Sequence, residues 1–129
     1  MEDIKNLNFE AYPKYSMKGL FWSLIGGVYL YNSYVSDINV YTFGRAIKIN
    51  LWHGVGIKNC ERKISKGPVS KIFKSRNIFT KIKYLSMFVK PDIFLSVSRQ
   101  MTELCSECFA IKREQFVENM YPRCDVFYL

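Results

Sequence analysis

Short apolar runs bounded by turn-forming residues alternate along the chain with segments whose apolar residues have helical spacing. The apolar runs predict strands at residues 28–31, 47–51, 93–97 and about 115–119. The helical spacing predicts helices that follow Ser16 and Ser98, two residues of the type that caps helix N-termini. Because strands alternate with helices, the sequence predicts an α/β fold with a parallel sheet.

The most apolar part of the chain, residues 19–31, combines a helix with the first predicted strand. A helix there would end at Gly26-Gly27, and its apolar residues would share one side that we expect to be buried. These residues are Leu20, Phe21, Leu24 and Ile25. The run is shorter than the ~20 apolar residues that span a bilayer, so it is predicted to be core.

Residues 58–90 contain all of the excess positive charge. Ten lysines and arginines lie there with one acid, Glu61, whereas the whole chain has a formal net charge of +8. From Val69 onward, bulky apolar residues recur among them at helical spacing. This pattern predicts a basic amphipathic helix suited to an anionic membrane surface. Single-stranded RNA is a further alternative, but we do not expect a nucleic-acid partner because the aromatic residues have core-like spacing.

Composition indicates one packed domain of 129 residues, with 49% hydrophobic and 16% aromatic residues. The first residues include two acids and no basic cluster, unlike a secretory signal, so we expect a cytoplasmic protein. Four cysteines and one histidine do not complete a common zinc set, and no metal is expected. Cys105 and Cys108 are instead predicted to be reduced core residues.

The candidate chemistry lies in residues 46–59, where a predicted strand runs into a glycine-containing turn. This turn carries His53, the only histidine of the chain, and the carboxyl edge of an α/β sheet is where ligands bind. An imidazole can take a proton from an alcohol, and Gly54 and Gly56 would let a phosphate approach the main chain near Lys58. An alternative is a histidine that only forms a hydrogen bond at a strand end, with glycines that serve the turn.

Arg123 follows the last predicted strand in the same way that His53 follows an earlier one. Both side chains are therefore expected to face one cleft at the carboxyl edge of the sheet. An arginine there would bind phosphate oxygens with its planar group and stabilise the charge of transfer. The alternative is a surface arginine in a proline turn, paired with Asp125.

Two blocks of sequence resemble the CDP-glycerol glycerophosphotransferase family, which builds teichoic acids and related capsule polymers. The stretch from Asn50 to Lys58 is similar to the family's Trp-His-Gly block, and Tyr121-Pro122-Arg123-Cys124-Asp125 resembles its Gly-Tyr-Pro-Arg-x-Asp. The resemblance implies a Rossmann-like domain, similar to the N-terminal half of a GT-B glycosyltransferase. We therefore expect residues 1–129 to form a single, incomplete acceptor-side domain with a basic amphipathic insertion at about 58–90. The donor-binding domain is expected to be absent.

The resemblance also implies a role for individual residues. His53 would be the general base that deprotonates an acceptor hydroxyl, which then attacks the β-phosphate of CDP-glycerol or a related CDP-polyol and expels CMP. The implied donor contacts are Trp52, Gly54, Val55, Gly56 and Arg123, with Lys58 as a further phosphate contact. The resemblance implies no cofactor and no metal beyond the donor substrate.

The sequence departs from the family's pattern in three ways, and the most important is that the motifs of the family's second half are absent. Met120 replaces the glycine before Tyr-Pro-Arg, and Val55-Gly56 replaces a frequent Thr-Pro, as in the capsule-associated branch. The isolated chain is expected to be inactive, because positioning and charge stabilisation need the missing wall of the cleft.

Expected partners are the donor, a polymer or lipid-linked acceptor, the donor domain and the inner face of an anionic membrane. The alternative is a non-catalytic basic membrane-binding module or an inactive remnant.

Overall fold

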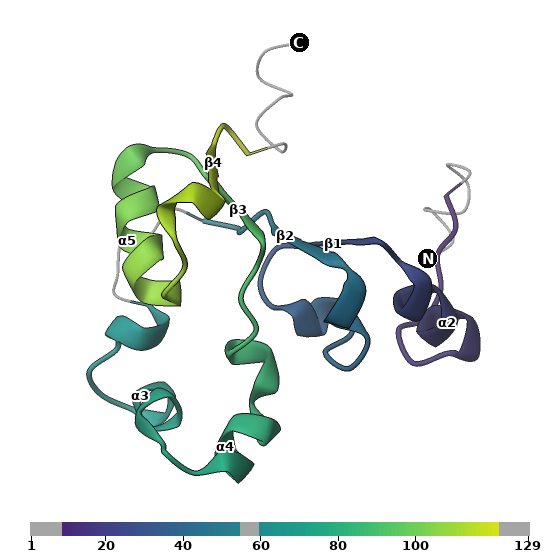
Figure 1. The fold of residues 1–129 in the computed structure, drawn as a ribbon, viewed down its shortest axis with the longest axis horizontal. Coiled ribbons are helices and arrows are strands. Elements are labelled where there is room, and N and C mark those ends of the chain that lie inside the picture. Colours follow the sequence, from purple (N-terminus) through teal and green to yellow (C-terminus); the bar gives the residue numbers. More distant parts are fainter. Residues whose placement is uncertain (1–8, 55–59, 122–129) are drawn as a thin grey trace.

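The computed structural model describes residues 9–54 and 60–121, and its centre is a parallel sheet (Figure 1). The strands are β1 (Val28–Tyr31), β2 (Ile47–Asn50), β3 (Ile93–Ser96) and β4 (Phe116–Glu118). They lie side by side in chain order, and every neighbouring pair is parallel. With its flanking helices, the sheet confirms the predicted α/β fold of Rossmann-like type.

The hydrophobic core lies on one face of the sheet. Tyr31, Asn50 and Phe94 occupy one row across β1, β2 and β3, and all are buried. Phe94 packs with Met101 and Cys105 of α5 (Arg99–Phe109). The opposite face carries exposed apolar residues, namely Val28, Leu30, Ile47 and Val117. Helices therefore cover mainly one side of this sheet.

Two serine caps predicted from the sequence begin the two longest helices. The Ser16 hydroxyl accepts a hydrogen bond from the Gly19 amide at the start of α2 (Met17–Ile25). Ser98 accepts a hydrogen bond from the Met101 amide at the start of α5. A capping side chain satisfies one of the backbone amides that have no partner inside the helix. Local chemistry thus determines where both helices begin.

The apolar side of α2 is exposed, in contrast to the prediction of a buried face. Leu24 is 63% exposed and Phe21 57%, and Ser23 is the buried residue of this helix. The helix docks through polar contacts, because Tyr29 donates a hydrogen bond to the Ser23 carbonyl and Thr42 donates one to the Ser23 hydroxyl. The helix lies beyond the edge strand β1, at one end of the molecule (Figure 1).

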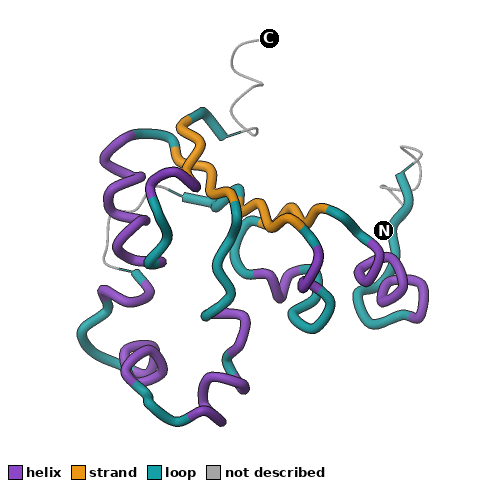
Figure 2. The backbone as a smooth tube through the Cα atoms, viewed as in Figure 1, coloured by secondary structure: helices purple, strands orange, loops and turns teal. Residues whose placement is uncertain are grey.

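The predicted basic amphipathic helix is instead two short helices, α3 (Pro68–Lys74) and α4 (Ile78–Lys83), followed by a 3-10 turn, η4 (Leu85–Met87). Figure 2 shows the break as a loop between helical segments. Asn77 causes it, because its side chain accepts a hydrogen bond from the Phe79 amide at 2.9 Å and caps a new helix. Within the described part of the chain, no helix is long and apolar enough to cross a membrane.

The remaining helical turns are short and lie in the connections between the main elements. They are η1 (Val35–Asp37), η2 (Phe43–Arg45), η3 (Glu61–Lys63) and η5 (Arg113–Gln115). The first two lie between β1 and β2, and Val35 packs there with Tyr29 and Tyr31. The third follows the candidate site and lies against α5.

Candidate functional site

The candidate site begins at the end of β2, where Asn50 turns the chain. Its buried side chain donates a hydrogen bond to the Ser33 carbonyl at 3.0 Å and accepts one from the Trp52 amide at 2.8 Å. An asparagine that bonds the backbone two residues on forms a local turn. The bond to Ser33 also joins this turn to the segment that follows β1. The sequence analysis named Asn50 only as the first residue of the stretch that resembles the Trp-His-Gly block. An asparagine near the end of a predicted strand is a turn signal that could have indicated this role.

Trp52 is half-buried and packs against the hydrophobic core. Its ring lies edge-on to Phe109 with centroids 5.0 Å apart, and 5.9 Å from the Phe94 ring. The residue adopts a left-handed conformation with φ = 53°, which costs a non-glycine residue about 1–2 kcal/mol. Packing against the core offsets that cost. The structure therefore places Trp52 as the support of the histidine that follows it.

His53 is exposed, and its ring orientation is defined by two contacts. Its Nδ1 atom lies 2.7 Å from the Asn32 carbonyl oxygen, and its ring centroid lies 4.5 Å from that of Trp52. A carbonyl oxygen can only accept a hydrogen bond, so Nδ1 carries the proton. The basic lone pair of the neutral ring is then on Nε2. A histidine held in this tautomer is suited to accept a proton at a defined position.

One described residue from each motif block lies at the carboxyl edge of the sheet, and these two residues are in contact. The Tyr121 hydroxyl donates a hydrogen bond to the Gly54 carbonyl at 2.9 Å, although the two residues are 67 positions apart. Tyr121 follows β4 and Gly54 follows β2, so the contact spans the end of the strand between them. The expectation that His53 and Arg123 face one cleft stays a prediction, because the observed contact joins Tyr121 and Gly54. The predicted site residues Val55, Gly56, Lys58 and Arg123 lie outside the described residues.

The turn after β1 binds both sides of the glycine-containing loop. Asn32 accepts from His53, and Tyr34 donates a hydrogen bond to the Glu61 carboxylate. Burial raises the pKa of Glu61, although the bond from Tyr34 and the charge of Arg62 oppose the rise. The sequence analysis assigned no role in the site to Asn32, Ser33, Tyr34 or Glu61. The available signals were the turn-forming pair Asn32-Ser33 and the isolation of one acid in a basic segment.

The three cysteines of the described residues are free thiols that lie wholly or partly inside the protein. Cys105 and Cys108 are buried on the core side of α5, as predicted. Burial raises the pKa of Cys105 and of Cys60 to about 12, so both thiols stay protonated at neutral pH. Within residues 9–54 and 60–121, no group of three or more His, Cys, Asp or Glu side chains is placed to hold a metal ion.

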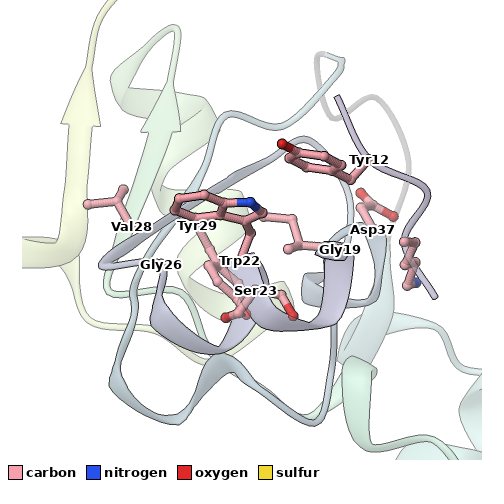
Figure 3. Close-up of a pocket in the computed structure, with 10 residues that line it drawn as sticks. Tyr12, Gly19, Trp22, Ser23, Gly26, Val28, Tyr29 and Asp37 are labelled. Atoms are coloured by element: carbon pink, nitrogen blue, oxygen red, sulfur yellow. The ribbon is translucent and has the colours of Figure 1, made fainter. Parts of the chain in front are cut away.

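A separate cavity of about 360 Å³ lies between α2 and the segment that precedes it (Figure 3). Tyr12, Trp22 and Asp37 line it, and none of the residues predicted for the site does. Ser23 and Tyr29 form part of its wall through the polar contact that docks α2. This cavity therefore belongs to the packing of α2 and not to the His53 site.

A comparison with models of protein families gives a match over nearly the whole chain. The family model described as CDP-Glycerol:Poly(glycerophosphate) glycerophosphotransferase matches residues 6–129. No match is found among curated proteins, and none among solved structures. The matched region includes His53, Gly54 and Tyr121 together with the whole described sheet. The chain therefore belongs to the CDP-glycerol:poly(glycerophosphate) glycerophosphotransferase family.

Proposed function

We propose that this domain supplies the acceptor side of an active site that transfers a polyol phosphate from a CDP-activated donor to a teichoic acid or capsule polymer. Membership of the family indicates a CDP-glycerol glycerophosphotransferase-like function, with a CDP-polyol donor and a polymer acceptor. The observation that carries the proposal is the exposed His53, held in the Nε2-basic tautomer beside the Tyr121 to Gly54 contact.

In the proposed reaction, His53 is the general base. Its Nε2 atom takes the proton of an acceptor hydroxyl, and the resulting oxygen attacks the β-phosphate of the donor. The new bond is between this oxygen and phosphorus, and the bond that breaks joins the same phosphorus to CMP, which leaves. The imidazolium that forms is stabilised by the Asn32 carbonyl, because its Nδ1–H already donates to that oxygen.

The proposed donor contacts lie around Gly54. A methyl group in place of its α-hydrogen would meet no atom within 4 Å, so open space lies beside the main chain there. This space supports the approach of a phosphate to Gly54, with Val55, Gly56 and Lys58 as further contacts. Arg123 follows Tyr121 by two positions in the sequence, and we propose it as a further phosphate ligand because its planar guanidinium group can bind phosphate oxygens.

We further propose that catalysis requires a donor-binding domain in a GT-B arrangement. The described His53 site presents a base and a glycine turn on one edge of a sheet, which is one wall of a cleft. Orientation of the donor and stabilisation of the phosphate charge need groups on the opposite side. An isolated domain of this kind is expected to bind weakly and to transfer at a negligible rate.

Peripheral association with the cytoplasmic face of the membrane is part of the proposal. The apolar residues Ile78 and Phe79 of α4 are 65% and 77% exposed, and Lys81 and Lys83 follow them on the same helix. Exposed apolar side chains flanked by lysines are typical of segments that lie in a membrane interface. This surface equally supports the second candidate, a non-catalytic membrane-binding module.

Replacement of His53 distinguishes these two functions. We expect His53→Ala and His53→Gln, made in the complete protein encoded by the gene, to reduce CMP release from CDP-glycerol by about 10²–10⁴-fold. Lys112→Ala, an exposed residue outside the site, serves as the control. Undiminished transfer in the His53 variants would eliminate the base role. Absence of CDP-polyol binding and transfer in the wild-type protein would leave the membrane-binding module.

A further inference from the structure

A second concave site lies among η3, α3, α4 and η4, in the basic part of the chain. Its volume is about 530 Å³. Its walls combine cations with apolar side chains. The cations are Arg62, Lys74, Arg76 and Lys81, and the apolar residues are Phe73, Ile82, Leu85 and Phe88. We call it the basic pocket.

The cations of the basic pocket form no ion pair within the described residues, although Arg62 lies near the Glu61 carboxylate. The ion pairs of the described residues involve Lys48, Lys63, Arg99 and Arg113, and no cation of the pocket. No aspartate or glutamate lines the cavity. Several positive charges around a concave surface raise the local concentration of anions. The basic pocket is therefore suited to a phosphate group.

The basic pocket lies away from the His53 site. The helix α4 and the turn η4 precede β3, whereas Gly54 and Tyr121 follow the ends of β2 and β4. In a parallel sheet these positions are at opposite edges, and Figure 1 shows α3 and α4 below the sheet and the end of β4 above it. A phosphate in the basic pocket is therefore an anchoring group and not the reacting one.

The apolar surroundings favour a lipid over a soluble polyanion. Ile82 lines the pocket and is 63% exposed, and it shares α4 with the exposed Ile78 and Phe79. Transfer of apolar side chains from water into a bilayer interface is favourable, whereas contact with a hydrated phosphate polymer does not remove them from water. Arg62 lies 5.5 Å from the centre of the Phe73 ring, which restrains its guanidinium group beside the cavity.

We propose that the basic pocket binds the headgroup of a single anionic phospholipid. Arg62, Arg76 and the pocket lysines bind its phosphate, and Phe73 and Phe88 contact its glycerol and the start of its acyl chains. The exposed end of α4 enters the bilayer beside it. This inference rests on the membrane association proposed above, and it adds a site that a single lipid molecule can saturate. Adsorption by charge alone would not have such a site.

A soluble short-chain lipid tests the site directly. Titration of the full chain with monomeric dihexanoyl-phosphatidylglycerol, followed by calorimetry, is expected to show saturable binding with one lipid per protein. The variant Arg76→Gln/Lys81→Gln is expected to weaken this binding at least about tenfold. The control Lys66→Gln/Lys71→Gln removes the same charge from the same segment but outside the pocket, and is expected to bind like the wild type. Equal weakening in both variants, or no saturation, would overturn the proposal.

Vesicles test the contribution of α4. The variant Ile78→Ser/Phe79→Ser is expected to reduce cosedimentation with phosphatidylglycerol vesicles while it retains binding of the monomeric lipid, because neither residue lines the pocket. Circular dichroism checks that each variant is folded. Loss of monomeric lipid binding in this folded variant would contradict the assignment of the headgroup to the pocket.

A polymer competitor distinguishes the lipid from the acceptor. Soluble poly(glycerophosphate) is expected not to displace the short-chain lipid at equal phosphate concentration. Displacement that requires Arg76 and Lys81 would assign the pocket to the polymer and overturn the lipid proposal. Transfer by the wild-type complete protein to a soluble acceptor without vesicles tests the catalytic proposal separately, so the two proposals can fail independently.

Discussion

The phenolic hydroxyl of Tyr121 donates a hydrogen bond to the carbonyl oxygen of Gly54 at 2.9 Å, and so joins the loop after β4 to the loop after β2. The two loops do not belong to adjacent strands, because β3 lies between them. The bond therefore places Tyr121 beside the last residue of the Trp-His-Gly sequence. This contact gives Tyr121 a structural role that can be measured.

Removal of this hydroxyl should loosen the site. We expect Tyr121→Phe to lower the free energy of unfolding by about 1 kcal/mol, because a hydrogen bond is lost at a buried ring. Transfer activity in the complete protein should fall as well, since Gly54 loses its anchor. Urea denaturation and CMP release measure the two effects. The matched control is Tyr41→Phe, because Tyr41 is 85% exposed. Equal behaviour of both variants would show that the bond has no role.

Replacement of Asn50 should disturb the turn that carries His53. We expect Asn50→Ala to lower the free energy of unfolding by about 2 kcal/mol, because the Ser33 carbonyl and the Trp52 amide both lose their partner. The near-ultraviolet circular dichroism of the tryptophans should change, since Trp52 packs on Phe94 and Phe109. Gln100→Ala, at an exposed position of α5, is the control. An unchanged spectrum with unchanged stability would contradict this role of Asn50.

Glu61 should make stability depend on pH. Burial raises the pKa of its carboxyl group, so the folded protein retains a proton that the unfolded chain has lost. The free energy of unfolding should therefore fall as the pH rises from about 4.3, the unfolded value, towards the raised pKa of the folded state.

The isosteric variant tests this dependence. Glu61→Gln cannot ionise, so its stability should fall less than that of the wild type across this range of pH. Denaturation in urea at a series of pH values measures the difference. Glu114→Gln, at an exposed position, controls for the loss of one negative charge. A wild-type slope in Glu61→Gln would show that another group causes the dependence.

The thiols of Cys60 and Cys105 should react slowly in the folded protein. Burial raises the pKa of both to about 12, which leaves a very small thiolate fraction at pH 8. Alkylation with iodoacetamide, followed by mass spectrometry of the peptides that contain Cys60 and Cys105, measures this reactivity. Each cysteine should be modified much more slowly in buffer than in 8 M urea. Rapid modification of either cysteine in the folded protein would contradict the raised pKa of its thiol.

Much of the fold could be predicted because its signals are local. The strands agree with the apolar runs to within about one residue, and Ser16 and Ser98 cap their helices as expected. A cap bonds an amide only three residues away, so the sequence nearby is sufficient to predict it. The same local chemistry explains the break at Asn77, where a capping residue interrupts helical spacing that by itself predicted one helix.

The sequence by itself determined the strands, the main caps and the two blocks that carry the candidate chemistry. Tertiary structure decided that the turn after β1 binds both His53 and Glu61, and that Tyr121 contacts Gly54. It also decided that α2 exposes its apolar side, because periodicity shows which side is apolar but not what packs against it. These relations depend on which distant segments pack together, since only folding brings residues 21, 27 or 67 positions apart within hydrogen-bond distance.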